Sequence, residues 1–302
     1  MKKILTYLII SASVLLLVSC DKPAPTQLVD DTDGDFEVEL LNKNIDDQYI
    51  SSGSDTSGIT QDLTGITNLI SVSGIKITDK TRTREFSLAQ AMFFDKSKPI
   101  KYSDGRLLSY QTLTPGTIKF NGTEANIVPF RIRFRDKGVP MDTLIGNKYL
   151  LYNLFSGWPD PFYFNYSSSV SCEFVSSIGG NTLNFNIFTP QEITSTVTFT
   201  GSRQDRNLET ILNWNPTLRG RISVIIGVMR PNQLTSIPVY KIRTRDNGQL
   251  RFPGRYLNQL PLEKFDRIVF TFVRSNEAFH GSGNNELLTS AQSIHSIVIE
   301  IP

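Results

Sequence analysis

The sequence offers few residues that could carry acid–base or nucleophilic chemistry. Its two histidines are His280 and His295. His280 lies two positions before Ser282 in a glycine-rich stretch, whereas a serine hydrolase needs a serine, a histidine and an acid held together. The Gly-x-Ser-x-Gly turn of hydrolases is absent, and His295 lies in an apolar strand pattern. We therefore expect no catalytic residue and a protein that is not an enzyme.

Metal and cofactor sites are equally poorly supported. Zinc requires three or four histidine, cysteine or carboxylate ligands with usable spacing, which the sequence does not offer. The segment Asp31–Asp35 is acidic and contains Gly34, but counting back from that glycine places Val29 and Leu40 at the first and last ligand positions of a calcium loop. We expect no metal and no cofactor. The sequence does not exclude a pair of carboxylates that acts on a glycosidic bond, because sequence separation does not determine the distance between two carboxylates in space.

An aromatic run between Tyr149 and Tyr166 is the densest chemical signal. Exposed rings there would stack on the apolar faces of sugars, with acid and amide groups such as Asn165 forming hydrogen bonds. Buried rings would instead pack between two domains, and this is the reading we prefer because aromatic side chains dominate cores. The candidate ligand-binding residues are Trp158, Asp160, Phe162, Tyr163 and Tyr166.

A second candidate surface is the strand pattern from Phe130 to Asp136. Its apolar residues alternate with Arg131, Arg133 and Arg135, so the three arginines share one face of a strand. They could bind a polyanion such as an acidic glycan or lipopolysaccharide. We prefer an exposed strand face whose arginines pair with neighbouring acids.

The elements that must position these residues are β-strands. The chain is rich in β-branched and aromatic residues and is punctuated by 15 prolines and 20 glycines, which is typical of an all-β protein with many turns. Asn121-Gly122 marks a tight hairpin turn. Strands are expected at 69–77, 86–94, 116–124, 130–136, 182–188, 193–199, 210–214, 222–228, 239–244, 249–252, 268–273 and 294–301, with helix as the alternative for 86–94 and one helical turn at 256–260.

This spacing predicts two β-sandwich domains of the immunoglobulin or fibronectin type, at residues 59–166 and 167–302. Trp214 is the expected core tryptophan of the second domain. Residues 20–58 are acidic and poor in apolar side chains, so they are expected to form a disordered, flexible tether in which Phe36–Leu40 alternates and could dock as a strand.

The first nineteen residues have the form of a signal peptide. Lys2 and Lys3 precede an apolar run from Ile4 to Val18 that is too short to span a bilayer. Residues 17–20, Leu-Val-Ser-Cys, resemble the lipobox of bacterial lipoproteins. The resemblance implies that cleavage follows Ser19, that the thiol of Cys20 receives a diacylglyceryl group, and that the new amino terminus is acylated. Several acyl chains hold a protein at a membrane where one does not.

The C-terminal half resembles uncharacterised two-domain, β-rich surface lipoproteins of bacteria. The resemblance rests on Leu212–Pro216, Asp246–Pro253, Leu257–Pro261 and Arg274, and it implies no established activity. Cys172 is then the one cysteine left, so no intramolecular disulfide can form.

Together these features predict a lipid-anchored, extracytoplasmic binding or structural protein without catalytic activity. The alternative is a glycan-binding accessory lipoprotein of a polysaccharide-processing system. The expected partners are the membrane, through Cys20, and a glycan or another envelope protein, whereas no block of sequence is basic enough for nucleic acid. We expect the protein to lie in the bacterial cell envelope, anchored at the outer membrane. It could face either the periplasm or the cell surface.

Overall fold

The computed structural model describes residues 36–41, 68–137, 139–153, 162–177, 180–233, 235–280 and 286–302. These residues form strands β1 to β17, one short α-helix and one 3-10 helix. The expected all-β class is therefore confirmed as a mostly β protein with several sheets. Residues 86–94, for which helix was the alternative, lie within a strand.

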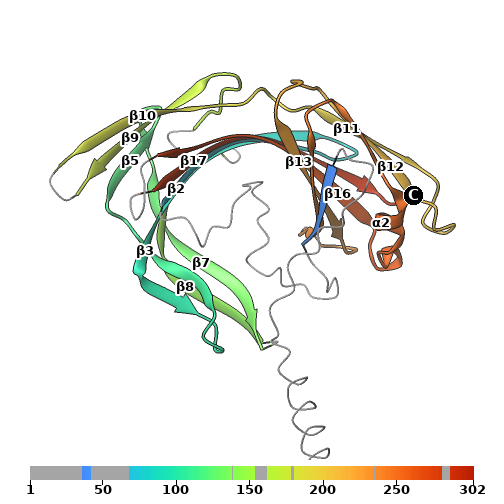
Figure 1. Cartoon of the computed structure of the whole chain (residues 1–302), viewed down its shortest axis with the longest axis horizontal. Helices are drawn as coiled ribbons and strands as arrows, with labels where there is room; N and C mark the ends of the chain where they lie inside the picture. The colour runs from blue at the N-terminus through green and yellow to red at the C-terminus, as the bar shows by residue number, and fades with distance from the viewer. Residues whose placement is uncertain are drawn as a thin grey trace, which may run out of the picture.

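The largest sheet has ten strands and curves as an arch (Figure 1). Its C-terminal strand pairs in parallel with an N-terminal one, from Leu287↔Asn68 to Ile297↔Thr78. Strands from either side of the domain boundary expected after Tyr166 therefore share this sheet. In sheet order the strands are β1 (Phe36–Leu40), β14 (Ile237–Arg245), β13 (Arg221–Met229), β16 (Arg267–His280), β17 (Leu287–Glu300), β2 (Asn68–Thr78), β3 (Thr83–Lys101), β8 (Val139–Asn153) and β7 (Asn126–Asp136), with β4 (Leu107–Leu113) paired to β3.

Two smaller sheets cover parts of the large one (Figure 1). One contains, in order, β10 (Thr182–Phe188), β9 (Ser169–Ser176), β5 (Gly116–Phe120) and β6 (Thr123–Glu124). The other contains β11 (Ser195–Thr200), β12 (Glu209–Trp214) and β15 (Gln249–Phe252). The predicted turn at Asn121-Gly122 joins β5 to β6, and both residues have positive φ, 50° and 82°, as a type I′ hairpin turn requires.

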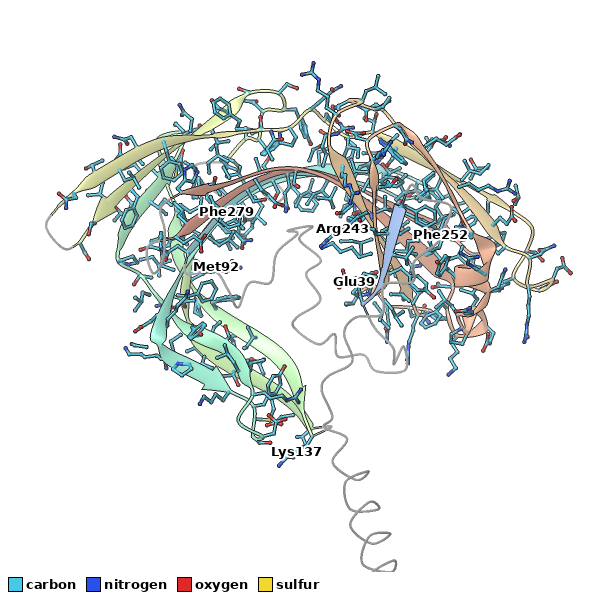
Figure 2. All side chains as sticks on the ribbon, viewed as in Figure 1. Glu39, Met92, Lys137, Arg243, Phe252 and Phe279 are labelled. Atoms are coloured by element: carbon cyan, nitrogen blue, oxygen red, sulfur yellow. The ribbon has the colours of Figure 1, made fainter. Side chains whose placement is uncertain are left out.

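Each small sheet closes a hydrophobic core against the large sheet. The N-terminal core contains Ile70, Phe120 and Tyr149, among others, and lies under the four-stranded sheet. The C-terminal core contains Trp214 and Phe252 and lies under the three-stranded sheet, where Figure 2 labels Phe252. Apolar burial is the main favourable term in folding, so these two cores hold the arch together.

The strand patterns explain this burial. Residues of β12 alternate between buried and half-buried positions, as expected for a strand with one face on a core. β13 is a nearly continuous apolar run and is buried on both faces from Ile222 to Met229. β1 pairs with β14, from Phe36↔Thr244 to Leu40↔Tyr240, so the segment that could dock does form a strand.

The helices follow β15. The α-helix α2 (Gly254–Asn258) begins after Pro253, and the 3-10 helix η2 (Leu262–Lys264) begins after Pro261. Proline is well tolerated at the start of a helix, because the backbone N–H that it lacks would have no acceptor within the helix there. Tyr256 and Leu257 of α2 pack into the C-terminal core, so the helical turn expected at 256–260 is confirmed slightly earlier in the chain.

Candidate functional site

Arg274 on β16 and Asp246, the residue after β14, form a buried ion pair. Their side chains are 6% and 1% exposed. The guanidinium binds the carboxylate with two parallel hydrogen bonds, Nε to Oδ2 at 2.8 Å and Nη2 to Oδ1 at 3.0 Å. Trp214 Nε1 donates to Oδ1 at 2.8 Å, and the Thr217 hydroxyl donates to Oδ2. Paired forks of this kind are the strongest geometry for an arginine and a carboxylate.

The remaining guanidinium hydrogens are also bonded. Nη1 donates to the carbonyl oxygens of Gln191 and Glu192, and Nη2 also donates to that of Asn215 at 2.6 Å. Burial alone would raise the pKa of Asp246, but hydrogen bonds from Arg274, Thr217 and Trp214 and the charge of Arg274 outweigh it, so the pKa lies below its usual value. No N–H of the guanidinium is left for a ligand. The pair therefore links β16 to the residue after β14, to β12 through Trp214 and to the segment before β11.

His295 on β17 forms a second buried polar contact. Its Nδ1 accepts a hydrogen bond from the backbone N–H of Ser195 at 2.9 Å and lies 2.8 Å from the Ser195 hydroxyl. A backbone N–H can only donate, so Nδ1 carries no proton, and in the neutral ring Nε2 donates to the Thr78 hydroxyl at 3.0 Å. Burial, followed by the charge of Lys76, lowers the pKa of His295.

This geometry argues against Ser195 and His295 as a nucleophile and base. The lone pair that would accept the serine proton already accepts a backbone hydrogen bond, and both side chains are buried. A general base must have that lone pair available in a plausible substrate pose. The contact instead ties β17 to β11 and β2 at the junction between the two cores.

Lys76 on β2 completes that junction. Its Nζ bonds to the carboxylate of Glu192 and lies 3.1 Å from Glu85 Oε1. Burial would lower the pKa of Lys76, but hydrogen bonds to Glu192 and Glu85 outweigh burial and raise it. Burial, then the charge of Glu192, raises the pKa of nearby Tyr166 to about 12, so this phenol keeps its proton.

The aromatic candidates are divided between core and surface. Phe162 is 2% exposed and belongs to the N-terminal core, so its ring has no free face for a sugar. Tyr166 is half-buried against Phe164, with ring centroids 5.1 Å apart. Tyr163 is 63% exposed. A Cβ at Gly74 would lie only 2.5 Å from the Phe164 ring, so glycine leaves the room that these rings occupy.

Among the three arginines, Arg131 is described in full. Its Nε lies 2.7 Å from Asp142 Oδ1 in an ion pair whose side chains are 54% and 40% exposed. Arg131 thus has the acidic neighbour that the preferred interpretation requires, and exposed pairs of this kind contribute little to stability. Arg133 and Arg135 lie on β7, and their side chains are outside the described residues.

Several other predicted features also lie outside the described residues: Cys20, Trp158, Asp160, Ser282 and the acidic segment Asp31–Asp35. His280, placed by the sequence in a glycine-rich loop, instead ends β16, and its Nε2 lies 3.0 Å from the Thr289 hydroxyl. Cys172 is a buried free thiol on β9, and burial raises its pKa to about 12.

Sequence reasoning missed a concentration of exposed apolar side chains on the arm that β4, β7 and β8 form. Figure 2 shows Lys137 at the tip of the β7–β8 hairpin, where this arm projects from the arch. The signal available in the sequence was that the apolar residues Val139, Met141 and Leu144 lie close to polar Asp142 and Thr143 in a strand pattern. The exposed apolar residues of the arm are Leu107, Leu113, Ile127, Val139, Met141 and Leu144.

No protein-family model matches this sequence, and no curated protein matches it. A solved structure of the yeast delta-COP-I mu-homology domain, complexed with Dsl1 WxWxV peptide, aligns with 76% of this chain and 98% of that chain, at 10% identity and a TM-score of 0.29. Within the described residues, no helix has the length and hydropathy of a membrane span. The same residues contain no group of three or more potential metal ligands.

Proposed function

We propose that this protein is a lipid-anchored, extracytoplasmic binding or structural protein without catalytic activity. The observation that supports a binding role most directly is the set of exposed apolar side chains on β4, β7 and β8. Soluble proteins rarely gather such side chains in one region unless the region contacts a partner or a membrane. The saturated hydrogen bonds of His295 and Arg274 support structural roles for the buried polar residues.

The anchor is the part of this proposal that the lipobox resemblance supports. The expected result is that the chain from native cells partitions into the detergent phase of Triton X-114, and that Cys20→Ser moves it to the aqueous phase. Protease added to intact cells would then separate the two faces of the outer membrane, because only a surface-exposed body is digested. Aqueous partitioning of the unaltered chain would contradict the anchor.

The binding role has its own test on the arm. Met141→Ser combined with Leu144→Ser removes two exposed apolar side chains without opening a core. We expect envelope proteins crosslinked to the unaltered chain to be lost from this variant, while its melting temperature stays the same. The matched control is Leu218→Ser, which removes an exposed apolar residue elsewhere. Equal crosslinking in all three chains would refute a binding role for the arm.

The second candidate is a glycan-binding accessory of a polysaccharide-processing system. Tyr163, the exposed member of the aromatic run, favours it, because an exposed ring stacks on the apolar face of a sugar. In a Trp214→Phe variant Trp158 is the remaining tryptophan, so strong quenching of its fluorescence by iodide would support a sugar site. Shielding from iodide would instead support packing.

The finer architecture is proposed as two immunoglobulin-like or fibronectin-like β-sandwiches. Its support is that each hydrophobic core contains residues of the large sheet and of one smaller sheet, as in packed sandwiches. The two bodies share the large sheet at β17 and β2.

A further inference from the structure

A cavity of about 620 Å³ opens at the end of the C-terminal half, away from the aromatic run and the arginine strand. Its walls come from the loop between β11 and β12 and from the segment joining α2 to η2. Volumes of roughly 300 to 1,000 Å³ are typical of small-molecule sites. Its lining includes Arg203, Arg206, Asn258, Gln259, Leu260 and Glu263.

Two guanidinium groups line this cavity, and most of their donors are free. Arg203 uses Nη1 to donate to the Phe265 carbonyl oxygen at 3.1 Å. The side chain of Arg206 forms no hydrogen bond or ion pair with any described residue. Arg206 is also held at φ +52°, a left-handed conformation that disfavours residues other than glycine. Because Arg206 is exposed, its guanidinium donors are accessible to an anionic ligand.

The loop that carries the arginines is braced from several sides. Leu208 N–H donates to Asn258 Oδ1 at 3.2 Å, which ties the loop to α2. Ser202 N–H donates to Asn207 Oδ1 at 2.9 Å, and Arg203 N–H donates to the Pro302 oxygen at 3.1 Å. The backbone of the loop is therefore held in place, and it presents the exposed side chains of Arg203 and Arg206 at the cavity.

Three carboxylates near the cavity contact residues other than Arg203 and Arg206, and two of them form ion pairs. Asp205 accepts from the Ser202 hydroxyl at 2.8 Å, Glu209 pairs with Arg251, and Asp266 pairs with Arg267. Glu263 is the acid among the lining residues, against two arginines. The lining residues therefore carry two positive charges against one negative charge, a balance that favours an anion.

The rest of the lining indicates what kind of anion fits. The apolar part of the lining comes from Pro261 and from Leu260 and Leu262, which are both largely buried. Asn258 and Gln259 are also lining residues, and their side-chain N–H groups are donors for hydroxyl or carboxylate oxygens. A carboxylate, several hydroxyls and an apolar ring face are combined in an acidic sugar. We infer that this cavity binds a carboxylate-bearing saccharide through Arg203 and Arg206.

The inference deepens the binding role proposed above and rests on it. Saturation-transfer difference NMR on the full chain in detergent tests it with three probes: sodium glucuronate, neutral glucose and inorganic phosphate. We expect transfer to glucuronate at millimolar concentration and at least tenfold weaker binding of glucose. Arg206→Gln should weaken glucuronate binding about tenfold or more, because a charge-assisted bond is lost. Arg219→Gln, which removes an exposed arginine outside the cavity, should leave it unchanged.

Each contrary result overturns a defined part of this inference. No transfer to glucuronate, or equal binding of glucose, overturns the site. Equal displacement of glucuronate by phosphate overturns the saccharide class. If Arg131→Gln loses glucuronate binding and Arg206→Gln keeps it, the binding site is the arginine strand. Equal melting temperatures of the variants and the unaltered chain exclude misfolding. The site and the anchor fail separately: an unaltered chain that stays in the aqueous phase and still binds glucuronate refutes the anchor alone, whereas a detergent-phase chain that does not bind glucuronate refutes the site alone.

Discussion

Replacing Asp246 with asparagine should destabilise the protein far more than breaking any exposed ion pair. The change leaves the Arg274 charge in a site where the two side chains are only 6% and 1% exposed. Removing one partner of a buried pair costs about 3–5 kcal/mol, against a total stability of about 5–15 kcal/mol for most folded proteins. With a urea m-value of about 3 kcal/mol/M, the unfolding midpoint should fall by about 1–2 M.

Urea unfolding followed by far-UV circular dichroism measures this midpoint. The matched control is Glu209→Gln, which breaks the ion pair with Arg251, whose side chains are 72% and 41% exposed. We expect the control to lie close to the unaltered chain, because exposed pairs are screened by solvent. Replacing both buried partners, as in Asp246→Leu with Arg274→Met, should cost less than the sum of the two single changes. Equal midpoints for Asp246→Asn and Glu209→Gln would refute the reasoning.

The same pair predicts a pH dependence. The pKa of Asp246 is lowered in the folded protein, so the folded state resists a proton that the unfolded chain accepts near pH 3.9. The stabilisation is therefore present above about pH 4 and is lost as pH falls through the lower, folded value. Midpoints measured from pH 6 to pH 2.5 should fall less steeply for Asp246→Asn than for the unaltered chain.

Three further outcomes are expected. Because the pKa of His295 is lowered by burial and by Lys76, stability should be full above about pH 6.5 and fall below it; melting temperatures of His295→Gln should show a flatter fall between pH 8 and pH 5. Phe162→Ala should cost about 3–5 kcal/mol in urea unfolding, because it opens a cavity in the N-terminal core, whereas Tyr163→Ala should stay within about 0.5 kcal/mol. Burial raises the pKa of the Cys172 thiol to about 12, so a thiol reagent at pH 8 should label it only in urea, and rapid labelling of the folded chain would contradict this placement.

Local pattern was enough to find most strands, but not their partners. The runs at 182–188 and 249–252 match β10 and β15 at both ends, because alternation with turn residues on either side is a property of the chain itself. The parallel pairing of β17 with β2 joins residues more than two hundred positions apart. Nothing in either strand's sequence specifies that partner.

The candidate sites divide in the same way. The segments of Trp214, Asp246 and Arg274 stood out in the sequence, yet their meeting around one carboxylate depends on the packing of β12, β14 and β16. The division of the aromatic run into buried Phe162 and exposed Tyr163 follows from the core beneath it. The cavity at Arg203 and Arg206 had no signal in the sequence, because its walls come from two loops joined by tertiary contacts.

What the sequence determined by itself is the β class, the turn at Asn121-Gly122 and the lipobox resemblance at Cys20. These depend on residues that are neighbours in the chain. Tertiary structure alone decided which charges are buried, which apolar side chains remain exposed on β4, β7 and β8, and where a positively charged cavity opens. The physical reason is that burial and electrostatic pairing are set by distances between residues far apart in the sequence, and those distances exist only once the sheets have packed.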